Sequence, residues 1–188
     1  DWAEDTATNV FGMINVIDAA RNSGVKRVIN FQTALCYGRP SEVPIPVSAS
    51  TAPFTSYGIS KVAAEAYLAM SGVPYVSMRL ANVTGPRLAI GPIPTFYSRL
   101  KEGKSCFCSD TMRDFLDMED FLSLMDLVMR DGAPTGTYNV SSGQGYTIKE
   151  IFEIVIQHLG IAYDGPIKIV PPGEDDVSNI GGQPAGDI

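Results

Sequence analysis

The sequence lacks the features that would place a protein in a membrane or on nucleic acid. No apolar run approaches the roughly 20 residues that a membrane-spanning helix needs, and residues 1–5 are acidic where a signal peptide would be basic. Lys and Arg total 14 against 21 Asp and Glu, so the net charge is −7, without a basic block or stripe. We therefore expect a cytoplasmic protein that binds neither membrane nor nucleic acid, because counterion release from phosphates requires clustered cations.

Cysteine and histidine are also scarce. The cysteines Cys36, Cys106 and Cys108 are an odd number and make a poor disulfide framework. Cys106 and Cys108 have no second cysteine pair, and the single histidine, His158, lies in a different helical segment, so we expect no metal site. We interpret the cysteine pair as small apolar residues on a strand, and His158 as a partly exposed surface residue.

The chain does contain an alternation of helical and strand-like segments. Apolar residues recur at helical spacing in residues 6–23, and Gly24 follows where a helix end favours a left-handed residue. Residues 26–32 form a β-branched run that suits a buried parallel strand rather than one with alternating exposure. The same order then repeats as a Pro-rich loop, a helix and a strand over 39–54, 57–70 and 73–80. This alternation predicts an α/β fold, a parallel sheet with helices on both faces.

The pattern changes after Gly85, where Pro86, Pro92 and Pro94 interrupt it. A chain of 188 residues that is 45% hydrophobic suits one globular domain, and we interpret this change as the start of a smaller second lobe. The later elements that we predict are a helix over 95–101, a strand over 105–108, a helix over 117–129, a strand over 137–140, a helix over 148–158, a strand over 167–170, and a loop or frayed end from residue 171.

Tyr57 and Lys61 are four residues apart in a predicted helix, so both side chains project from one helical face. A free tyrosine has a pKa near ~10 and is a poor base at neutral pH, but a nearby cation favours the phenolate and would lower that pKa. By itself this spacing is common by chance and favours an ordinary surface pair.

The residues upstream change that interpretation. Thr33 directly follows the predicted strand, at the carboxyl edge where open α/β sheets bind their ligands. Together with Tyr57 and Lys61, the stretch 30–38 resembles the extended short-chain dehydrogenase/reductases, in their nucleotide-sugar epimerase and dehydratase branch. In that family a Ser or Thr ends this strand and a Tyr-x-x-x-Lys helix follows.

Further segments resemble motifs of the same family, in the same order. Each has an ordinary alternative by itself: Asn9 as a plain helix residue, Gly85 with Pro86 as a turn, and Arg113 as part of a solvated pair. Five ordered elements are much more specific than any one of them. The additional segments are Asn9-Val10-Phe11-Gly12, the strand end 79–87 with Asn82, Arg113-Asp114-Phe115, and Tyr138-Asn139-Val140 before the turn 141–143.

The resemblance implies a fold and a division into domains. The fold would be a Rossmann-type doubly wound parallel sheet, of which residues 1–85 would form the C-terminal half of the NAD-binding domain. Residues 86–188 would be mainly a smaller α/β substrate-binding lobe, with about 117–140 returning to the Rossmann domain.

The resemblance also implies a reaction. Tyr57 would be the general base that removes a sugar hydroxyl proton while hydride passes to the nicotinamide, giving a transient keto-sugar. Lys61 would hold the ribose and tune Tyr57, and Thr33 would hydrogen-bond the reacting hydroxyl and carry its proton. Asn9 and Leu80 would join these three beside the cofactor.

Asn82 and Arg113 would hold the diphosphate of the nucleotide sugar, a task suited to the planar, permanently charged guanidinium of arginine. The helices that carry Asn9 and Tyr57 would form the interface of a homodimer. The cofactor would be NAD, with NADP not excluded, because neither the glycine-rich phosphate turn nor the selecting residue is in this chain. We therefore expect these 188 residues to hold only part of a dinucleotide site.

Ala34 and Leu35 favour one branch of the family over another. Dehydratases and decarboxylases typically place an acid one or two residues after the catalytic Ser or Thr, and here both positions are apolar. We therefore predict epimerisation at C4 of a nucleotide-diphosphate sugar, with a UDP-sugar as the expected substrate. The alternatives are a dehydratase or decarboxylase of the same family, or a non-catalytic module that binds NAD(H) or a sugar nucleotide.

Overall fold

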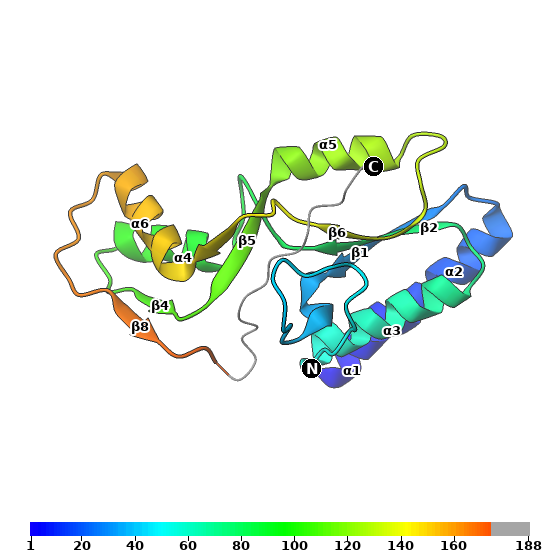
Figure 1. Cartoon of the computed structure of the whole chain (residues 1–188), viewed down its shortest axis with the longest axis horizontal. Coiled ribbons are helices and arrows are strands. Elements are labelled where there is room, and N and C mark those ends of the chain that lie inside the picture. Colours follow the sequence, from blue (N-terminus) through cyan, green and yellow to red (C-terminus); the bar gives the residue numbers. More distant parts are fainter. Residues whose placement is uncertain (174–188) are drawn as a thin grey trace.

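The structure is a computed structural model, and it describes residues 1–173. Figure 1 shows an elongated molecule in which a first sheet with its helices lies beside a second, smaller assembly of short strands and helices. The α/β class that the alternation predicts is confirmed.

The first sheet is parallel and has the strand order β1-β2-β6. Thr33 pairs with Leu80, and Leu80 pairs with Val140, so all three strands end at one edge. Helices α2 and α3 cover one face and α5 covers the other (Figure 1). The bounds are Gly12–Ser23 for α2, Val28–Thr33 for β1, Ser56–Met70 for α3, Tyr75–Leu80 for β2, Met118–Val128 for α5 and Gly136–Val140 for β6.

The N-terminal helix ends where the sequence predicts but begins earlier. Gly24 has a left-handed backbone with φ 64°, a conformation that glycine adopts without steric cost. The helix starts with α1 (Trp2–Asp5), capped by the Asp1 side chain, rather than at residue 6. Between α1 and α2 lies a π-helical turn, η1 (Thr6–Phe11), and such turns are frequent at functional sites.

The two faces of the first sheet differ in chemistry. Toward α5 the strands present apolar side chains, including Val76, Met78 and Val140, which pack with Phe121 of the helix. Toward α2 and α3 the strands are apolar where they begin and polar where they end. That face runs from Val28 and Tyr75, packed with Ile17 and Leu68, to buried Asn30, Gln32, Ser77 and Asn139.

The expectation of a uniformly buried strand over 26–32 is wrong. The buried side chains of β1 are the polar Asn30 and Gln32, whereas Phe31 is 48% exposed and packs edge-on against Phe121. A strand turns alternate residues to opposite faces, so this run of mixed residues has alternating burial although its partner is parallel.

A second sheet, with the strand order β3-β5-β7, was not predicted from the sequence. β3 runs parallel to β5, and β7 runs antiparallel to it. Two of these strands have only three residues each, too few for a periodic signal, and the Met-Arg-Asp-Phe-Leu-Asp sequence of β5 does not alternate apolar with polar residues. The bounds are Asn82–Thr84 for β3, Met112–Asp117 for β5 and Gly145–Thr147 for β7.

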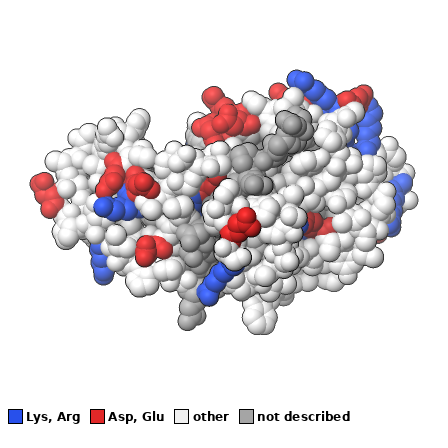
Figure 2. Space-filling model, viewed as in Figure 1, with Lys and Arg blue, Asp and Glu red and all other residues white. Residues whose placement is uncertain are grey.

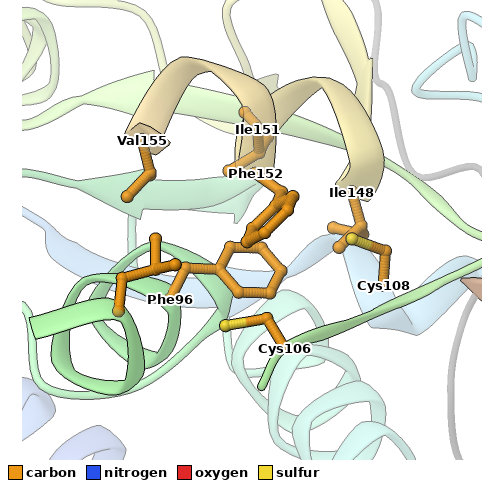
Figure 3. Close-up of a cluster of buried hydrophobic side chains, with 8 residues drawn as sticks. Phe96, Cys106, Cys108, Ile148, Ile151, Phe152 and Val155 are labelled. Carbon is orange, nitrogen blue, oxygen red and sulfur yellow. The ribbon is translucent and has the colours of Figure 1, made fainter. Parts of the chain in front are cut away.

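The small lobe has its own apolar core, in which α4 packs against α6 (Figure 3). Phe96 of α4 meets Phe152 of α6 with ring centroids 5.0 Å apart, and Cys106 and Cys108 are buried beside them. The interpretation of the cysteines as small apolar residues is thus confirmed, and His158 is exposed at the surface. The bounds are Pro92–Lys101 for α4, Phe107–Ser109 for β4, Ile148–Leu159 for α6 and Lys168–Val170 for β8, which pairs with β4.

Most elements predicted for the second part of the chain are confirmed within a few residues. The division into domains stays a prediction. The tail beyond residue 173 lies outside the described residues. On the face seen in Figure 2, Lys and Arg are scattered among Asp and Glu. Within residues 1–173, no helix has the length and apolarity to span a membrane, and no three His, Cys, Asp or Glu side chains converge on a common point.

Candidate functional site

Thr33 lies where β1 ends and a short 3₁₀ turn, η2 (Ala34–Tyr37), begins. Its hydroxyl oxygen accepts a hydrogen bond from the Leu35 backbone N–H at 3.2 Å and so caps the turn. The side chain is half-buried, at the edge where the three strands of the first sheet end. The position predicted from the sequence is therefore correct, although its catalytic role stays a prediction.

Tyr57 and Lys61 lie in the first turns of α3, whose start is fixed by the Thr55 hydroxyl accepting from the Gly58 N–H at 3.1 Å. The Gln32 amide donates to the Lys61 carbonyl at 2.8 Å, which holds the helix against the end of β1. The Lys61 ammonium donates to the Phe31 carbonyl. The structure thus brings Lys61 beside the two residues that precede Thr33, while the Tyr57 ring stays 43% exposed.

The electrostatics of this pair differ from the prediction. Burial, followed by the negative charge of Asp5, raises the pKa of Tyr57 above its usual value. Burial lowers the pKa of Lys61, and the nearby Glu65 carboxylate opposes that change. The expectation that Lys61 lowers the Tyr57 pKa is wrong for this structure, because the ammonium is directed to a backbone carbonyl of β1 instead.

Asn9 lies in the π-helical turn and faces α3. Its amide donates to the Ser60 hydroxyl at 2.9 Å, and that hydroxyl donates to the Tyr57 carbonyl at 2.9 Å. Four residues earlier, Asp5 accepts a bond of 2.6 Å from the Ser56 hydroxyl. The first helix is therefore fastened to the turn of α3 that carries Tyr57.

Leu80 is the last residue of β2 and is half-buried, paired with Thr33 on one side and Val140 on the other. It joins the apolar cluster beneath α5. Its position at the strand end is compatible with a backbone contact to a ligand, and this contact stays a prediction.

Asn82 and Arg113 lie on adjacent strands of the second sheet, β3 and β5. Asn82 is exposed on β3, and its amide donates to the Asp114 carbonyl of β5 at 3.0 Å, next to Arg113. The Asp114 carboxylate is fully buried and accepts the backbone N–H groups of Ser142 and Gly143, each at 2.8 Å. Asp114 belongs to the Arg113-Asp114-Phe115 motif, but the sequence did not predict that it holds the 141–143 turn.

A cavity of about 320 Å³ opens beside Arg113, between α4 and the strands β4 and β5. Sequence reasoning did not single out its other lining residues, among them Phe96, Arg99, Phe107 and Ser109. One signal was available: in Cys106-Phe107-Cys108 the strand alternation buries both cysteines and leaves Phe107 57% exposed. Two arginines and aromatic rings around one cavity suit a ligand that has both phosphate and a flat ring.

Comparisons with known proteins identify a family model and related solved structures. The family model described as the NAD dependent epimerase/dehydratase family matches residues 2–141. The structure of the Bordetella bronchiseptica enzyme WbmG in complex with NAD and UDP is 64% identical, with a TM-score of 0.94, and the match covers 98% of this chain and 59% of that chain. The structure of the enzyme WbmH from the same organism, in complex with NAD⁺, is 41% identical with a TM-score of 0.87, covering 98% of this chain and 62% of that chain.

A curated relative adds an activity. The UDP-glucose 4-epimerase of Streptomyces lividans is 29% identical over 175 residues, which cover 81% of this chain and 53% of that protein. The chain therefore spans little more than half the length of the proteins it matches.

Proposed function

Because the chain belongs to the NAD dependent epimerase/dehydratase family, we propose that it is part of an NAD-dependent epimerase that inverts C4 of a UDP-sugar. The observation that carries the proposal is that Lys61, one helical turn after Tyr57 on α3, is hydrogen-bonded to Phe31 and Gln32, the two residues that precede Thr33 at the end of β1. The likeness to WbmG, described with NAD and UDP, supports the same conclusion over 98% of the chain.

Each of the three side chains has a distinct task in this proposal. The Tyr57 phenol, half-exposed at the sheet edge, is the base that takes the proton from the C4 hydroxyl and later returns it. Thr33 hydrogen-bonds the same hydroxyl and fixes which oxygen faces Tyr57. Lys61, held by Phe31 and Gln32, presents its ammonium on the same face of α3 as Tyr57.

The residues present fit the nicotinamide half of NAD. An ammonium that donates to Phe31 keeps further N–H donors for ribose hydroxyls. Asn9 is hydrogen-bonded to Ser60, the residue before Lys61, and Leu80 pairs with Thr33 at the strand end. When bound, NAD supplies the redox chemistry, taking a hydride from the sugar carbon and giving it back.

The UDP moiety has a candidate site in the small lobe. Arg113 and Asn82 would meet the diphosphate, and the cavity lined by Phe107 and Arg99 would receive the base. These side chains come from β3, β4, β5 and α4, so nucleotide binding and proton transfer are built on different elements.

The direct test follows the sugar by ¹H NMR in the complete protein with NAD and UDP-glucose or its N-acetyl and acidic analogues. We expect interconversion of the C4 epimers and no loss of water. Elimination of water, seen as a deoxy-keto product, would favour the dehydratase alternative, although Ala34 and Leu35 leave that reaction without an adjacent acid.

Tyr57→Phe separates an enzyme from a non-catalytic binding module. Removing the phenolic oxygen should lower kcat by roughly 10²–10⁴-fold while UDP still binds, because the nucleotide contacts lie in the other lobe. Tyr138→Phe, which removes a hydroxyl that donates to the exposed Thr135 carbonyl, is the matched control and should leave kcat unchanged. Equal turnover in both variants would contradict a catalytic Tyr57.

We also propose that the protein is a homodimer through the helices that carry Asn9 and Tyr57. Trp2, Ile59 and Tyr67 are 81%, 54% and 44% exposed, and they line one apolar cavity of about 560 Å³ with Val10 and Ala63. Light scattering of the complete protein should give a dimer mass, and Ile59→Glu should shift it toward the monomer. A monomeric wild type would contradict this interface.

The remaining expectations concern location. A cytoplasmic enzyme without nucleic-acid or membrane partners is supported by the net charge of −7. Cell fractionation tests it, since activity in the membrane pellet would contradict it.

A further inference from the structure

A buried polar network lies behind the candidate catalytic residues and takes no part in the proposed chemistry. It is centred on Arg79 of β2, whose guanidinium donates to the Glu65 carboxylate of α3 at 2.6 Å. Both side chains are about nine-tenths buried, with exposures of 10% and 9%. A buried ion pair costs desolvation, so its presence calls for a role beyond stability alone.

The network continues from Arg79 into the segment that follows Thr33. Its Nη1 atom donates to the Tyr37 hydroxyl at 2.8 Å, and that hydroxyl donates to Asn139 of β6 at 2.6 Å. The Tyr37 side chain is 3% exposed, and the Arg79 guanidinium lies 5.0 Å from the centre of its ring. Tyr37 therefore has a defined partner on each side of its hydroxyl.

The same side chains hold residues 38–54, which we call the strap, because they join Thr33 and η2 to Tyr57 and α3. Asn139 donates to the Ile45 carbonyl at 2.7 Å, and Arg79 donates to the Val47 carbonyl at 3.1 Å. The strap has no helix or long strand of its own to fix its path. Its middle is thus fastened by side chains from the sheet.

The ends of the strap are also drawn together. The Ala52 N–H donates to the Cys36 carbonyl at 2.9 Å. Gly38 has φ 66°, and a Cβ there would lie 2.0 Å from the Ala52 carbonyl oxygen, so only glycine permits this approach. The two ends that meet here lead directly to Thr33 and to Tyr57.

Glu65 connects the network to the catalytic face of α3. It lies one helical turn beyond Lys61 and two beyond Tyr57, on the same side of the helix. Its carboxylate also accepts from the Ser77 hydroxyl at 2.7 Å, and Ser77 in turn accepts from Asn30 at 2.9 Å. The helix is therefore fixed to β1 and β2 through one carboxylate.

We propose that Tyr37 and Arg79 are positioning residues, which hold the strap and α3 in one arrangement so that Thr33 and Tyr57 face the same sugar hydroxyl. This inference rests on the proposed epimerase function. Neither residue touches the substrate: both act through Thr33 and Tyr57, whose spacing depends on the strap.

The test is Tyr37→Phe in the complete protein, with Tyr138→Phe as the matched control. Tyr138 is on β6 beside Asn139, and its hydroxyl donates only to the exposed Thr135 carbonyl at 3.2 Å. Removing the Tyr37 hydroxyl should lower kcat for C4 epimerisation roughly tenfold to a hundredfold, as expected when reacting groups are misplaced by about 1 Å. KM and the Kd for UDP should stay within about twofold, since those contacts lie in the small lobe.

The assay is run well below the melting temperature of each variant, so that lost folding does not pass for lost positioning. A wild-type kcat in Tyr37→Phe, whatever its melting temperature, would overturn the proposal. A parallel loss of kcat and UDP binding would overturn it too, because it would show general damage rather than misplacement.

Hydrogen exchange without substrate provides a second measurement. We expect backbone amides of the strap and of the first turn of α3 to exchange at least about tenfold faster in Tyr37→Phe than in Tyr138→Phe. If the wild type epimerises no sugar, the proposed function fails, and exchange alone then decides whether Tyr37 holds the strap. Unchanged exchange in both segments would overturn the positioning role.

Discussion

The first sheet and the small lobe differ in the kind of side chains that they bury. The first sheet buries polar side chains on the face covered by α2 and α3, where Asn30, Ser77 and Asn139 join the Arg79–Glu65 ion pair. The small lobe instead buries an apolar core between α4 and α6, with Phe96 against Phe152. Its main buried charge is Asp114, which binds backbone amides.

The difference follows from what each region holds in place. Proton transfer requires two side chains from different elements at a fixed spacing, and directional hydrogen bonds fix spacing better than apolar contacts do. A nucleotide pocket is formed by a concave surface, and close-packed apolar side chains suffice to shape it. Consistent with this, buried polar side chains of the first sheet bind α3 at Lys61 and bind Tyr37, in the turn that follows Thr33.

The largest effect should come from breaking the ion pair of the first sheet. Arg79→Met leaves the Glu65 carboxylate buried without its partner, and we expect a loss of about 3–5 kcal/mol in the free energy of unfolding. Lys26→Met is the control, because the Lys26–Asp131 pair is 76% and 79% exposed and should contribute no more than about 1 kcal/mol. Urea denaturation measures both, and equal losses would show that burial does not set the difference.

The buried aspartate of the second sheet should matter less. Asp114→Asn replaces one of two accepting oxygens by an NH₂ group, so either the Ser142 or the Gly143 N–H loses its acceptor. We expect a loss of about 1–3 kcal/mol and faster hydrogen exchange of these two amides. Asp110→Asn, at an exposed position two residues before β5, should change neither quantity. Slow exchange in Asp114→Asn would mean that the turn is held by other contacts.

Removing a single buried methylene from the apolar core of the small lobe should lower the stability of the protein measurably. Ile151→Val removes buried volume from the face of α6 that meets Phe96, and we expect a loss of about 0.5–1.5 kcal/mol. Ile154 is on the same helix but 49% exposed, so Ile154→Val should lower the free energy of unfolding by less than about 0.5 kcal/mol. Thermal unfolding of both variants tests this, and a larger loss at Ile154 would place that side chain in an interface.

The smallest effect concerns the charge near Tyr57. The Asp5 carboxylate raises the pKa of Tyr57, so Asp5→Asn should lower it. Because Tyr57 must be deprotonated to act as a base, kcat rises with pH below that pKa, and the acidic limb should move to lower pH. The displacement should be small, because the Tyr57 side chain is partly exposed and solvent screens its interaction with Asp5.

The side-chain amide that Asp5→Asn introduces keeps a carbonyl oxygen that can still accept the Ser56 bond, so the local structure stays intact. Glu4→Gln, one residue away and exposed, is the control and should leave the pH profile in place. Displacement to higher pH would contradict the sign of the interaction, and no displacement would indicate that another group controls the limb.

Local signals in the sequence were sufficient for most helices. The capping residues Thr55, Asp117 and Thr147 each bind a backbone N–H at the start of a helix, and Gly24 ends one with a left-handed backbone. Such contacts join residues two or three apart, so they are visible in the chain itself. The placement of Thr33 and the Tyr57–Lys61 pair was predictable for the same reason.

The cavity beside Arg113 was not predictable in this way. Arg99, Phe107 and Arg113 come from three elements, and nothing in their spacing along the chain shows that they share one space. The second sheet was missed because β3 and β7 are three residues long and stable only through pairing with β5.

The sequence by itself thus determined the α/β alternation, the C-terminal ends of most helices and the family motifs around Thr33 and Tyr57, because these depend on neighbours along the chain. Only the tertiary structure decided that Lys61 donates to Phe31 and that polar residues fill the face beneath α3. It also decided that Tyr37 meets Asn139, 102 residues away. The physical reason is that a buried hydrogen bond depends on which distant group the fold places within reach, and residue spacing carries no record of that distance.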